Sequence, residues 1–387
     1  MEVIRLKRTS RVLEGHLWVF SNELTASPKQ YEPGTVVELR DKKDVFLGIG
    51  YVNPQSLIAV RILTHEREEI TPAFFKKRIL DALEYRKRFI RNTNAYRVVF
   101  SESDFISGLI VDRYDTCLAV QFLTAGMEKQ AEVILGVLDE TFSPSVIVLR
   151  NDSSSRLLEG LPRERKIVRG TLDTLPVIQE DGIRFEVNPL AGQKTGFFLD
   201  QRANRTAFSH LIEGGEGLDL FCYAGAWSMH LAARGSHVIG LDESDVAVEQ
   251  ARRNAELNGL EKQCEFLKDN VFTFLGKQIN ENRKYDFVVL DPPAFVKNKA
   301  KIREGLRGYR EINAHALKLL KKHGLLATSS CSYHIDRETF LEMLRSSARD
   351  AGRKVRILEM RSQARDHPVL LPMPETEYLK CLFLEVI

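Results

Sequence analysis

Near-continuous apolar runs recur along the second half of the chain, and polar residues follow them. Such runs precede Asp242 and Asp291, and another occupies residues 324–331. Longer segments with helical periodicity separate them. Because buried strands that alternate with helices indicate a mostly parallel sheet covered on both faces, residues 182–387 are predicted to form a doubly wound α/β domain.

The helices of this domain have recognisable ends. Ser244 is a predicted N-cap, and Gly259 is the predicted stop of the same helix. The final two strands follow each other without a helix, so they are expected to add an antiparallel edge to the sheet. The further helices are expected at residues 309–322 and 336–351, and the edge strands at residues 354–360 and 377–387.

The first half of the chain has a different pattern. Residues 1–71 contain short alternating or apolar runs broken by turns, which predict a small β-barrel domain. The three clearest runs are residues 34–41, 45–52 and 57–63. Strands return from Val98, with a helix near residues 129–141, so residues 72–181 are predicted to form a central α+β domain.

A basic helix is expected at residues 72–91, at the start of the central domain. Thr71 is its predicted N-cap, and the proline after it suits the first helical position. Its apolar stripe includes Leu80 and Phe89, whereas the opposite face is basic and includes Arg86. This face either contacts phosphates or solubilises an interdomain helix.

Composition limits the function classes. The chain has 387 residues, 43% hydrophobic and 28% charged, with a formal net charge of +3, so overall charge neither favours nor opposes a nucleic-acid partner. The N-terminus lacks the apolar segment of a signal peptide, and no apolar run is long enough to span a membrane. The five cysteines are far apart and form no CxxC, which argues against a disulfide framework and a metal site. A cytoplasmic protein is expected, in which a reactive thiol stays reduced.

Residues at the strand ends predict a nucleoside cofactor. Gly225 follows the first strand and permits a close backbone approach, although the segment is not GxGxxG. Asp242 is placed to accept hydrogen bonds from ribose hydroxyls, and Asp269 with Asn270 ends the third strand near an adenine position. Each feature alone is also a common turn or helix cap, but three strand ends together favour an adenosine-type ligand.

Two residues that follow apolar strands are candidates for the chemistry. Asp291 precedes two prolines, which direct the loop away from the sheet, and Cys331 stands where an apolar strand ends. A thiolate that adds to C6 of a pyrimidine makes C5 nucleophilic, which is covalent catalysis. Amino-group methyltransferases with a related loop need no thiol, and their aromatic residue follows the prolines directly, whereas Ala294 intervenes here. His334 is interpreted as a turn residue, and the base that activates the thiol is left open.

Several segments resemble the class I S-adenosylmethionine-dependent methyltransferases, namely DLFCYAGAWS, GLDES, LKDN, VVLDPPAFV and SSCS. More narrowly, LAGQKTGFFLDQRANR, LDPPAFVKNK and SCSYHI resemble the bacterial 23S rRNA cytosine-C5 methyltransferases. The resemblance implies an N-terminal PUA-like domain, a central α+β domain and a C-terminal Rossmann-like methyltransferase domain. It also implies S-adenosyl-L-methionine as cofactor and large-subunit rRNA as partner.

The resemblance assigns roles to individual residues. It implies Cys331 as nucleophile and Asp291 as a residue that contacts both the target base and the cofactor. The implied cofactor contacts are Phe198, Asp200, Gln201 and Arg202 at the methionine part, Asp219, Tyr223, Ala224 and Gly225 in the first loop, Asp242 at the ribose, and Asp269 near adenine. Asn270, which ends the third strand with Asp269, and Glu243 are the further predicted cofactor contacts. The first loop departs from the Thr-Gly-Gly of many relatives, because it reads Ala224-Gly225-Ala226.

Basic residues follow the Asp291 loop and are expected to contact RNA phosphates. They are Lys297, Lys299, Lys301, Arg303, Arg307 and Arg310. A solvated helix face is the alternative interpretation of this run.

Taken together with the resemblance, the sequence predicts an enzyme that forms 5-methylcytosine in rRNA. The alternatives are a uracil-C5 or exocyclic-amine methyltransferase and a noncatalytic RNA-binding assembly protein, and a homodimer is compatible with each.

Overall fold

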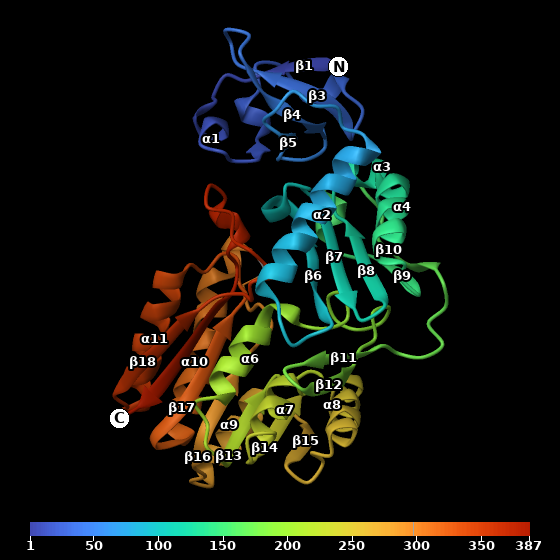
Figure 1. Cartoon of the computed structure of the whole chain (residues 1–387). Helices are drawn as coiled ribbons and strands as arrows, with labels where there is room; N and C mark the ends of the chain where they lie inside the picture. Colours follow the sequence, from blue (N-terminus) through green and yellow to red (C-terminus); the bar gives the residue numbers. More distant parts are fainter. Residues whose placement is uncertain (297) are drawn as a thin grey trace. The chain divides into compact units, whose positions relative to one another are not determined.

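The computed structural model describes residues 1–296 and 298–387, which divide into two compact units (Figure 1). The first unit comprises Met1–Ile178, Val187–Leu199 and Arg365–Thr376. The second comprises Gln179–Glu186, Asp200–Ala364 and Glu377–Ile387. Among the described residues, no helix is both long and apolar enough to cross a lipid bilayer.

The N-terminal part of the first unit is a mixed sheet with strand order β1-β3-β4-β5-β2. Its strands are β1 (Glu2–Arg5), β2 (Trp18–Val19), β3 (Thr35–Arg40), β4 (Phe46–Val52) and β5 (Val60–Thr64), and α1 (Ser10–Leu13) lies between the first two. β1 pairs parallel with β3, and the other pairs are antiparallel. The three predicted strands are confirmed as β3, β4 and β5, whereas the short β1 and β2 were not predicted.

The rest of the first unit is a second sheet, with order β10-β9-β8-β7-β6, packed against helices. Its strands are β6 (Ala95–Phe100), β7 (Leu109–Tyr114), β8 (Cys117–Phe122), β9 (Val146–Asn151) and β10 (Glu164–Arg169). Its helices are α2 (Pro72–Phe89), α3 (Ala125–Lys129), α4 (Ala131–Phe142) and α5 (Ser155–Leu158). The hydroxyl of Thr71 accepts from the amide of Phe74, which confirms the predicted N-cap of α2.

The predicted faces of α2 are partly wrong. Leu80 and Phe89 are each 38% exposed, although they were expected in the apolar stripe. Arg86 was expected on the basic face but is only 1% exposed. Its guanidinium pairs with Asp104 at 2.5 Å and donates to the carbonyl of Arg97 at 2.8 Å. Burial is possible because these long-range partners satisfy the charge.

The second unit is built on a sheet with order β15-β14-β13-β16-β17-β19-β18. Its strands are β13 (Gly215–Leu220), β14 (Ser236–Asp242), β15 (Cys264–Lys268), β16 (Tyr285–Leu290), β17 (Leu320–Ser330), β18 (Val355–Arg361) and β19 (Lys380–Val386). β13 to β17 pair parallel, and β19 pairs antiparallel with β17 and β18, which confirms the predicted antiparallel edge. The hairpin β11 (Val177–Glu180) and β12 (Ile183–Glu186) precedes this sheet.

Helices cover both faces of this sheet (Figure 1). They are α6 (Arg202–Ser209), α7 (Ala226–Ala232), α8 (Asp245–Asn258), α9 (Val271–Asn280), α10 (Ile302–Leu319) and α11 (Arg337–Ala351). On β19, Leu382 and Leu384 join the core that includes α9, α10 and α11, whereas Phe383 packs against Phe208 of α6 at 5.0 Å between ring centroids. Alternate residues thus face opposite helix layers, as a doubly wound fold requires.

The boundary between α10 and β17 differs from the prediction. The helix was expected to run from Tyr309 to Lys322, but it begins at Ile302 and ends at Leu319. The strand begins immediately at Leu320 rather than at Gly324. The basic run after Asp291 therefore lies partly within α10.

Candidate active site

The loop after β13 has an unusual backbone. Phe221, Tyr223 and Gly225 have positive φ angles of 66°, 47° and 74°. The two aromatic residues would leave this region if the surrounding structure did not hold them, and such strain concentrates at functional sites. A Cβ at Gly225 would lie 3.0 Å from Phe266 Cζ and 3.1 Å from Ala251 Cβ. Glycine is therefore required here by both its φ angle and the close packing.

Asp242 holds this loop from the end of the next strand. Its Oδ2 accepts from the amide of Tyr223 and its Oδ1 accepts from the amide of Ser244, both at 3.0 Å. The side chain of Ser244 caps α8, and Gly259 ends that helix in the left-handed region, as predicted. Each carboxylate oxygen of Asp242 keeps a further lone pair, so the residue can both support the loop and accept a ligand hydroxyl.

Asp219 is a buried carboxyl at the same end of the sheet. Its Oδ2 accepts from the amide of Ser228 at 3.0 Å and from the hydroxyl of Ser228 at 2.6 Å. Its Oδ1 is buried and has no hydrogen-bond partner among the residues that the structure describes. Burial raises the pKa of Asp219 to about 7, with Ser228 lowering it and the nearby Asp291 and Asp242 raising it. A carboxyl oxygen left without a partner fits a cationic or N–H donor on a bound cofactor.

Polar residues meet at the carboxyl ends of β14 and β15, which are neighbours in the sheet. The side-chain amide of Asn270 donates to Glu243 Oε1 at 2.5 Å. Its oxygen accepts from the amide of Thr273 at 3.1 Å, so Asn270 is also the N-cap of α9. Asp269 accepts from the amide of Asn270 at 2.7 Å and is exposed. The predicted contact of Asp269 and Asn270 with adenine stays a prediction.

Asp291 is held in one orientation at the end of β16. Its Oδ1 accepts from Gln201 Nε2 at 2.9 Å, and its Oδ2 accepts from Trp227 Nε1 at 3.1 Å. The same Gln201 amide nitrogen donates to Ser329 Oγ at 3.0 Å, and its oxygen accepts from Asn204 at 2.7 Å. Gln201 therefore links the carboxylate on β16 to the end of β17, two residues before Cys331.

Trp227, Asn204 and Ser329 were not identified from the sequence as site residues. Trp227 is one of only two tryptophans, and it lies two residues after Gly225. A buried indole N–H needs a hydrogen-bond acceptor, so the position of Trp227 beside the predicted cofactor loop could have identified it as a site residue. The roles of Asn204 and Ser329 depend on the contacts of Gln201, which only the fold brings together.

The serines around Cys331 fix the tip of β17. Ser330 Oγ donates to the hydroxyl of Tyr309 at 3.1 Å, and Ser332 Oγ lies 3.0 Å from the same hydroxyl. Ser332 Oγ also accepts from the amide of Val296 at 3.3 Å, and its carbonyl accepts from Lys380 Nζ at 2.9 Å. These contacts hold the residues on both sides of Cys331, so the thiol stands on a rigid support.

Cys331 differs from the other cysteines in its surroundings. It is half-buried, whereas Cys117, Cys222, Cys264 and Cys381 are buried. Burial raises the pKa of Cys117, Cys264 and Cys381 to about 12 and that of Cys222 well above its ordinary value. These four side chains remain thiols at neutral pH and pack as small apolar groups.

The predicted methionine-side residues fall into two groups. Asp200 and Arg202 are buried in the second unit with Gln201, and the hydroxyl of Tyr378 donates to Asp200 Oδ2 at 2.7 Å. Phe198 belongs to the first unit, where Lys194 Nζ lies 4.5 Å from its ring centroid. Ala224 is buried, and its carbonyl accepts from Asn254 at 2.9 Å.

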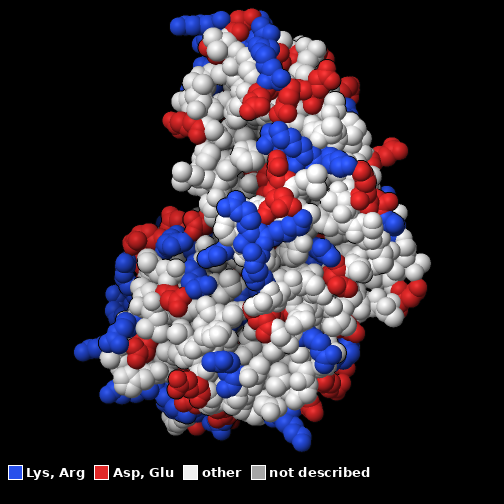
Figure 2. All heavy atoms as spheres, viewed as in Figure 1, with Lys and Arg blue, Asp and Glu red and all other residues white. Residues whose placement is uncertain are grey.

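The predicted RNA-contact residues differ in their availability. Arg303 and Arg307 are exposed on α10, and Lys299 is exposed just before it. Lys301 pairs with Glu304 at 2.5 Å, and Arg310 makes a two-point ion pair with Asp350 of α11 at 2.5 and 2.7 Å. Lys297 lies outside the described residues. Figure 2 shows acidic and basic side chains interspersed over the face in view, so neither sign covers that face alone.

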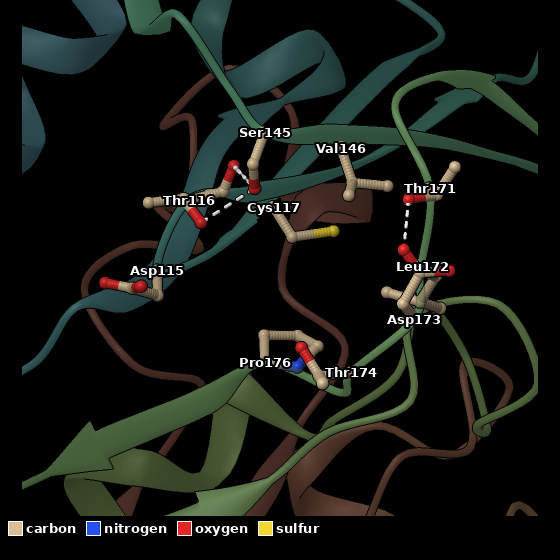
Figure 3. Close-up of a pocket in the computed structure, with 10 residues that line it drawn as sticks. All are labelled: Asp115, Thr116, Cys117, Ser145, Val146, Thr171, Leu172, Asp173, Thr174 and Pro176. Carbon is tan, nitrogen blue, oxygen red and sulfur yellow. Dashed lines mark hydrogen bonds between the residues drawn. The ribbon is translucent and has the colours of Figure 1, made fainter.

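A separate hollow of about 330 Å³ lies in the first unit (Figure 3). The turn between β7 and β8, the start of β9 and a loop near Thr171 line it. Thr116 bonds Ser145 at 2.8 Å, and Thr171 donates to Asp173 at 2.6 Å. The Cys117 thiol at its wall has the pKa of about 12 given above, so this hollow offers no activated nucleophile.

Comparisons with known proteins bear on both units. Residues 149–373 match the family described as S-adenosylmethionine-dependent methyltransferase, and residues 3–65 match the PUA-like domain. A Pseudoalteromonas atlantica protein named Ribosomal RNA large subunit methyltransferase I is 36% identical over 385 residues, which is 98% of each chain. A protein of the same name from Shewanella amazonensis is 38% identical over 96% of this chain and 95% of its own.

Solved structures share the fold. A Streptococcus mutans protein assigned to the SAM-dependent methyltransferases has a TM-score of 0.84 at 20% identity, with 100% of both chains covered. A second structure, of a methyltransferase candidate complexed with SAH, has a TM-score of 0.86 at 20% identity and covers 100% of this chain and 99% of its own. The predicted Rossmann-like fold with an N-terminal PUA-like domain is confirmed.

Proposed function

Because the chain belongs to the S-adenosylmethionine-dependent methyltransferases and to the family of the proteins named Ribosomal RNA large subunit methyltransferase I, we propose that it forms 5-methylcytosine in large-subunit rRNA. The observation that carries the proposal is the position of Gln201, which bonds both Asp291 and Ser329. This bridge brings the carboxylate that would hold a base close to the strand end that carries the thiol.

S-adenosyl-L-methionine, when bound, supplies the methyl group. The residues proposed to hold it are those of the strand ends. Asp219 offers a partnerless carboxyl oxygen, and Asp242 has lone pairs left for ribose hydroxyls. The remaining proposed contacts are Phe198, Asp200, Gln201, Arg202, Tyr223, Ala224, Gly225, Glu243, Asp269, Asn270 and Asp291.

In the proposed chemistry, Cys331 is the nucleophile and Asp291 holds the target base. The Cys331 thiolate adds to C6 of cytosine, and the electron pair of the C5–C6 double bond becomes available at C5. After methylation at C5, a base removes the C5 proton and the thiolate leaves C6, which restores the double bond. Asp291 holds the N3 and N4 edge of the base through this sequence. Its fixed carboxylate orientation, set by Gln201 and Trp227, supports this role.

The surroundings of Phe295 disfavour an exocyclic-amine methyltransferase. In that chemistry an aromatic residue after the prolines packs against the target base. Here the Phe295 ring lies 4.7 Å from the ring centroid of Tyr309, and 6.2 Å from those of Phe221 and Phe272. Gly308 of α10 faces this ring closely, because a Cβ there would lie 3.2 Å from Phe295 Cδ2. The ring is thus engaged within the protein.

The RNA is proposed to contact both the PUA-like domain and the basic residues after Asp291. We divide the chain into residues 1–71 for RNA binding, 72–181 for the central α+β domain and 182–387 for methyl transfer. The PUA-like domain contains a hollow of about 480 Å³ lined by Arg8, Arg11 and Phe20, among others. Cationic and aromatic groups suit the phosphates and bases of accessible RNA. We place the reaction in the cytoplasm, and a homodimer is a further hypothesis that sedimentation would test.

One experiment separates the candidate functions. The protein is incubated with S-adenosyl-L-methionine and rRNA that contains 5-fluorocytosine, whose C5 fluorine cannot be removed as a proton. The proposal predicts a covalent protein–RNA adduct that Cys331→Ala abolishes. Methyl transfer without an adduct would indicate an amine methyltransferase. The absence of both methyl transfer and the adduct would indicate a binding protein. Chromatography of the nucleosides from unmodified rRNA then distinguishes 5-methylcytosine from a methylated uridine.

A further inference from the structure

Lys380 lies at the strand end that carries Cys331. It begins β19, and the antiparallel pairing places it opposite Ser330 of β17. Its side chain is buried, with the whole residue only 5% exposed. Nζ donates to the carbonyl of Ser332 and to that of Tyr378, both at 2.9 Å. An ammonium has three N–H donors, so these two contacts fix the group and leave one donor for another acceptor.

The charges around Lys380 point to the thiol as that acceptor. Burial lowers the pKa of Lys380 to about 8, and the negative charge of Cys331 raises it most among its neighbours, followed by Glu377 and Asp336, while Arg337 lowers it. The two carboxylates have other partners. Glu377 pairs with Arg337 at 2.5 Å, and Asp336 caps α11 by accepting from the amide of Thr339 at 2.8 Å.

The other polar groups near the thiol are less suited to accept its proton. Burial raises the pKa of Tyr309, so its hydroxyl stays neutral, and this hydroxyl contacts Ser330 and Ser332. Both oxygens of Asp291 accept from N–H donors. His334 lies beside the exposed Tyr333, with ring centroids 5.4 Å apart. Lys380 is the cation whose contacts attach it directly to the Cys331–Ser332 segment.

We propose that Lys380 is the positioning residue that maintains Cys331 as a thiolate, an inference that rests on the proposed function of Cys331 as nucleophile. Starting from the neutral thiol and the neutral Lys380 amine, the proton leaves Sγ and is held on Nζ, which gives the thiolate and the ammonium, and no other bond changes. The thiolate then adds to C6 of the base. When the methylated base is released, the thiolate returns to the same ammonium. Lys380 thus acts through Cys331 and needs no contact with the RNA.

The test measures the thiol without RNA or cofactor. The rate at which iodoacetamide alkylates Cys331 is followed against pH by mass spectrometry of the Cys331 peptide. In the native protein, the pH at which the alkylation rate is half-maximal (the midpoint) is expected below about 8.5, which is the ordinary pKa of a cysteine thiol. Lys380→Met should move the midpoint up by about one unit and slow alkylation near pH 7 by about tenfold. Lys380→Arg retains the cation and should keep the midpoint low.

The controls make the outcome decisive. Lys322→Met removes an exposed lysine from β17 and should leave the profile unchanged. A profile of Lys380→Met that coincides with the native one would overturn the proposal. If that variant does not fold, the thiolate absorbance of the native protein, taken as a difference from Cys331→Ser, gives the midpoint directly, and a midpoint at or above about 8.5 would also overturn it. If the alkylation profile depends on Lys380 but no 5-fluorocytosine adduct forms, the proposed function is refuted and the role of Lys380 in forming the thiolate is not.

Discussion

Replacing Glu180 by Gln removes the charge that neutralises a buried guanidinium. Glu180 and Arg205 are each 1% exposed, and the two N–H groups of Arg205 donate to the carboxylate at 2.8 and 2.7 Å. His230 Nε2 lies 3.0 Å from the same carboxylate. Arg205 belongs to α6, which follows Gln201, and His230 belongs to α7 with Trp227. The pair therefore supports both residues that orient Asp291.

The expected cost is large because the remaining charge cannot reach water. Removing one partner of a buried pair costs about 3–5 kcal/mol. The pKa gives a second measure. Burial alone would raise the pKa of Glu180, but Arg205 and His230 lower it from 4.5 to about 2. At 1.36 kcal/mol per pKa unit, this shift corresponds to roughly 3 kcal/mol of stability.

The sign of the pH dependence follows from the lowered pKa. The stabilisation is fully present above the unfolded pKa near 4.5 and is lost as the pH falls toward the folded value of about 2. The native second unit should therefore lose stability steadily between these values. The Glu180→Gln variant should lack this part of the acid dependence.

Urea unfolding measures both effects. The fluorescence of Trp227 reports on unfolding of the second unit. The Trp18→Phe substitution removes the tryptophan fluorescence of the first unit. Glu186→Gln is the matched control, since Glu186 pairs with the exposed Arg253 at 3.2 Å and should cost under about 1 kcal/mol. If Glu180→Gln costs no more than Glu186→Gln at pH 7, the buried pair does not stabilise the unit and the reasoning is wrong.

Two further changes test the site and the RNA surface. Gln201→Leu removes the donor shared by Asp291 and Ser329, and methyl transfer should slow by about tenfold or more, because a hydrogen bond to a charged group contributes about 1.5–3 kcal/mol. An unchanged rate in a radiolabelled methyl-transfer assay would show that the bridge is dispensable. Replacing both Arg303 and Arg307 by Ala should weaken RNA binding and reduce the slope of log affinity against log salt by about 1.5–2. Filter binding at several salt concentrations measures this slope, and an effect no larger than that of Arg345→Ala on α11 would argue against RNA contact at α10.

The alternation of strands and helices along the second unit was predictable, because apolar runs identify buried strands without any knowledge of their partners. The junction of α10 and β17 was not. The helix ends at Leu319 and the strand starts at Leu320, so no polar loop marks the boundary. The pairing of β16 with β17 also shifts register between Leu320 and Leu325, and His323 has a positive φ of 63°. The exposed residues in this irregular segment therefore resembled the last turn of a helix.

Long-range partners explain the residues that the sequence analysis missed. Arg86 resembled its basic neighbours on α2, and its burial depends on Asp104 and on a carbonyl from β6. Lys380 stands in an apolar run where a cation was unexpected, and its partners lie at the tip of β17. Lys380 was visible in the sequence as a single charge within an apolar run, whereas Arg86 was not distinguished from its neighbours. In both cases the compensating groups are brought together only by folding.

The strand-end residues show how a ligand contact can be separated from a structural role. Asn270 caps α9, and Asp242 accepts two backbone amides, so the loops alone account for these side chains. Asp219 is different, because one of its buried oxygens has no partner within the described residues. An unpaired buried carboxyl oxygen costs free energy, so it persists where a ligand satisfies it. The structural contacts of Asp219 therefore explain its side chain less completely than those of Asp242 and Asn270 do, and a donor on a bound ligand would satisfy the remaining oxygen.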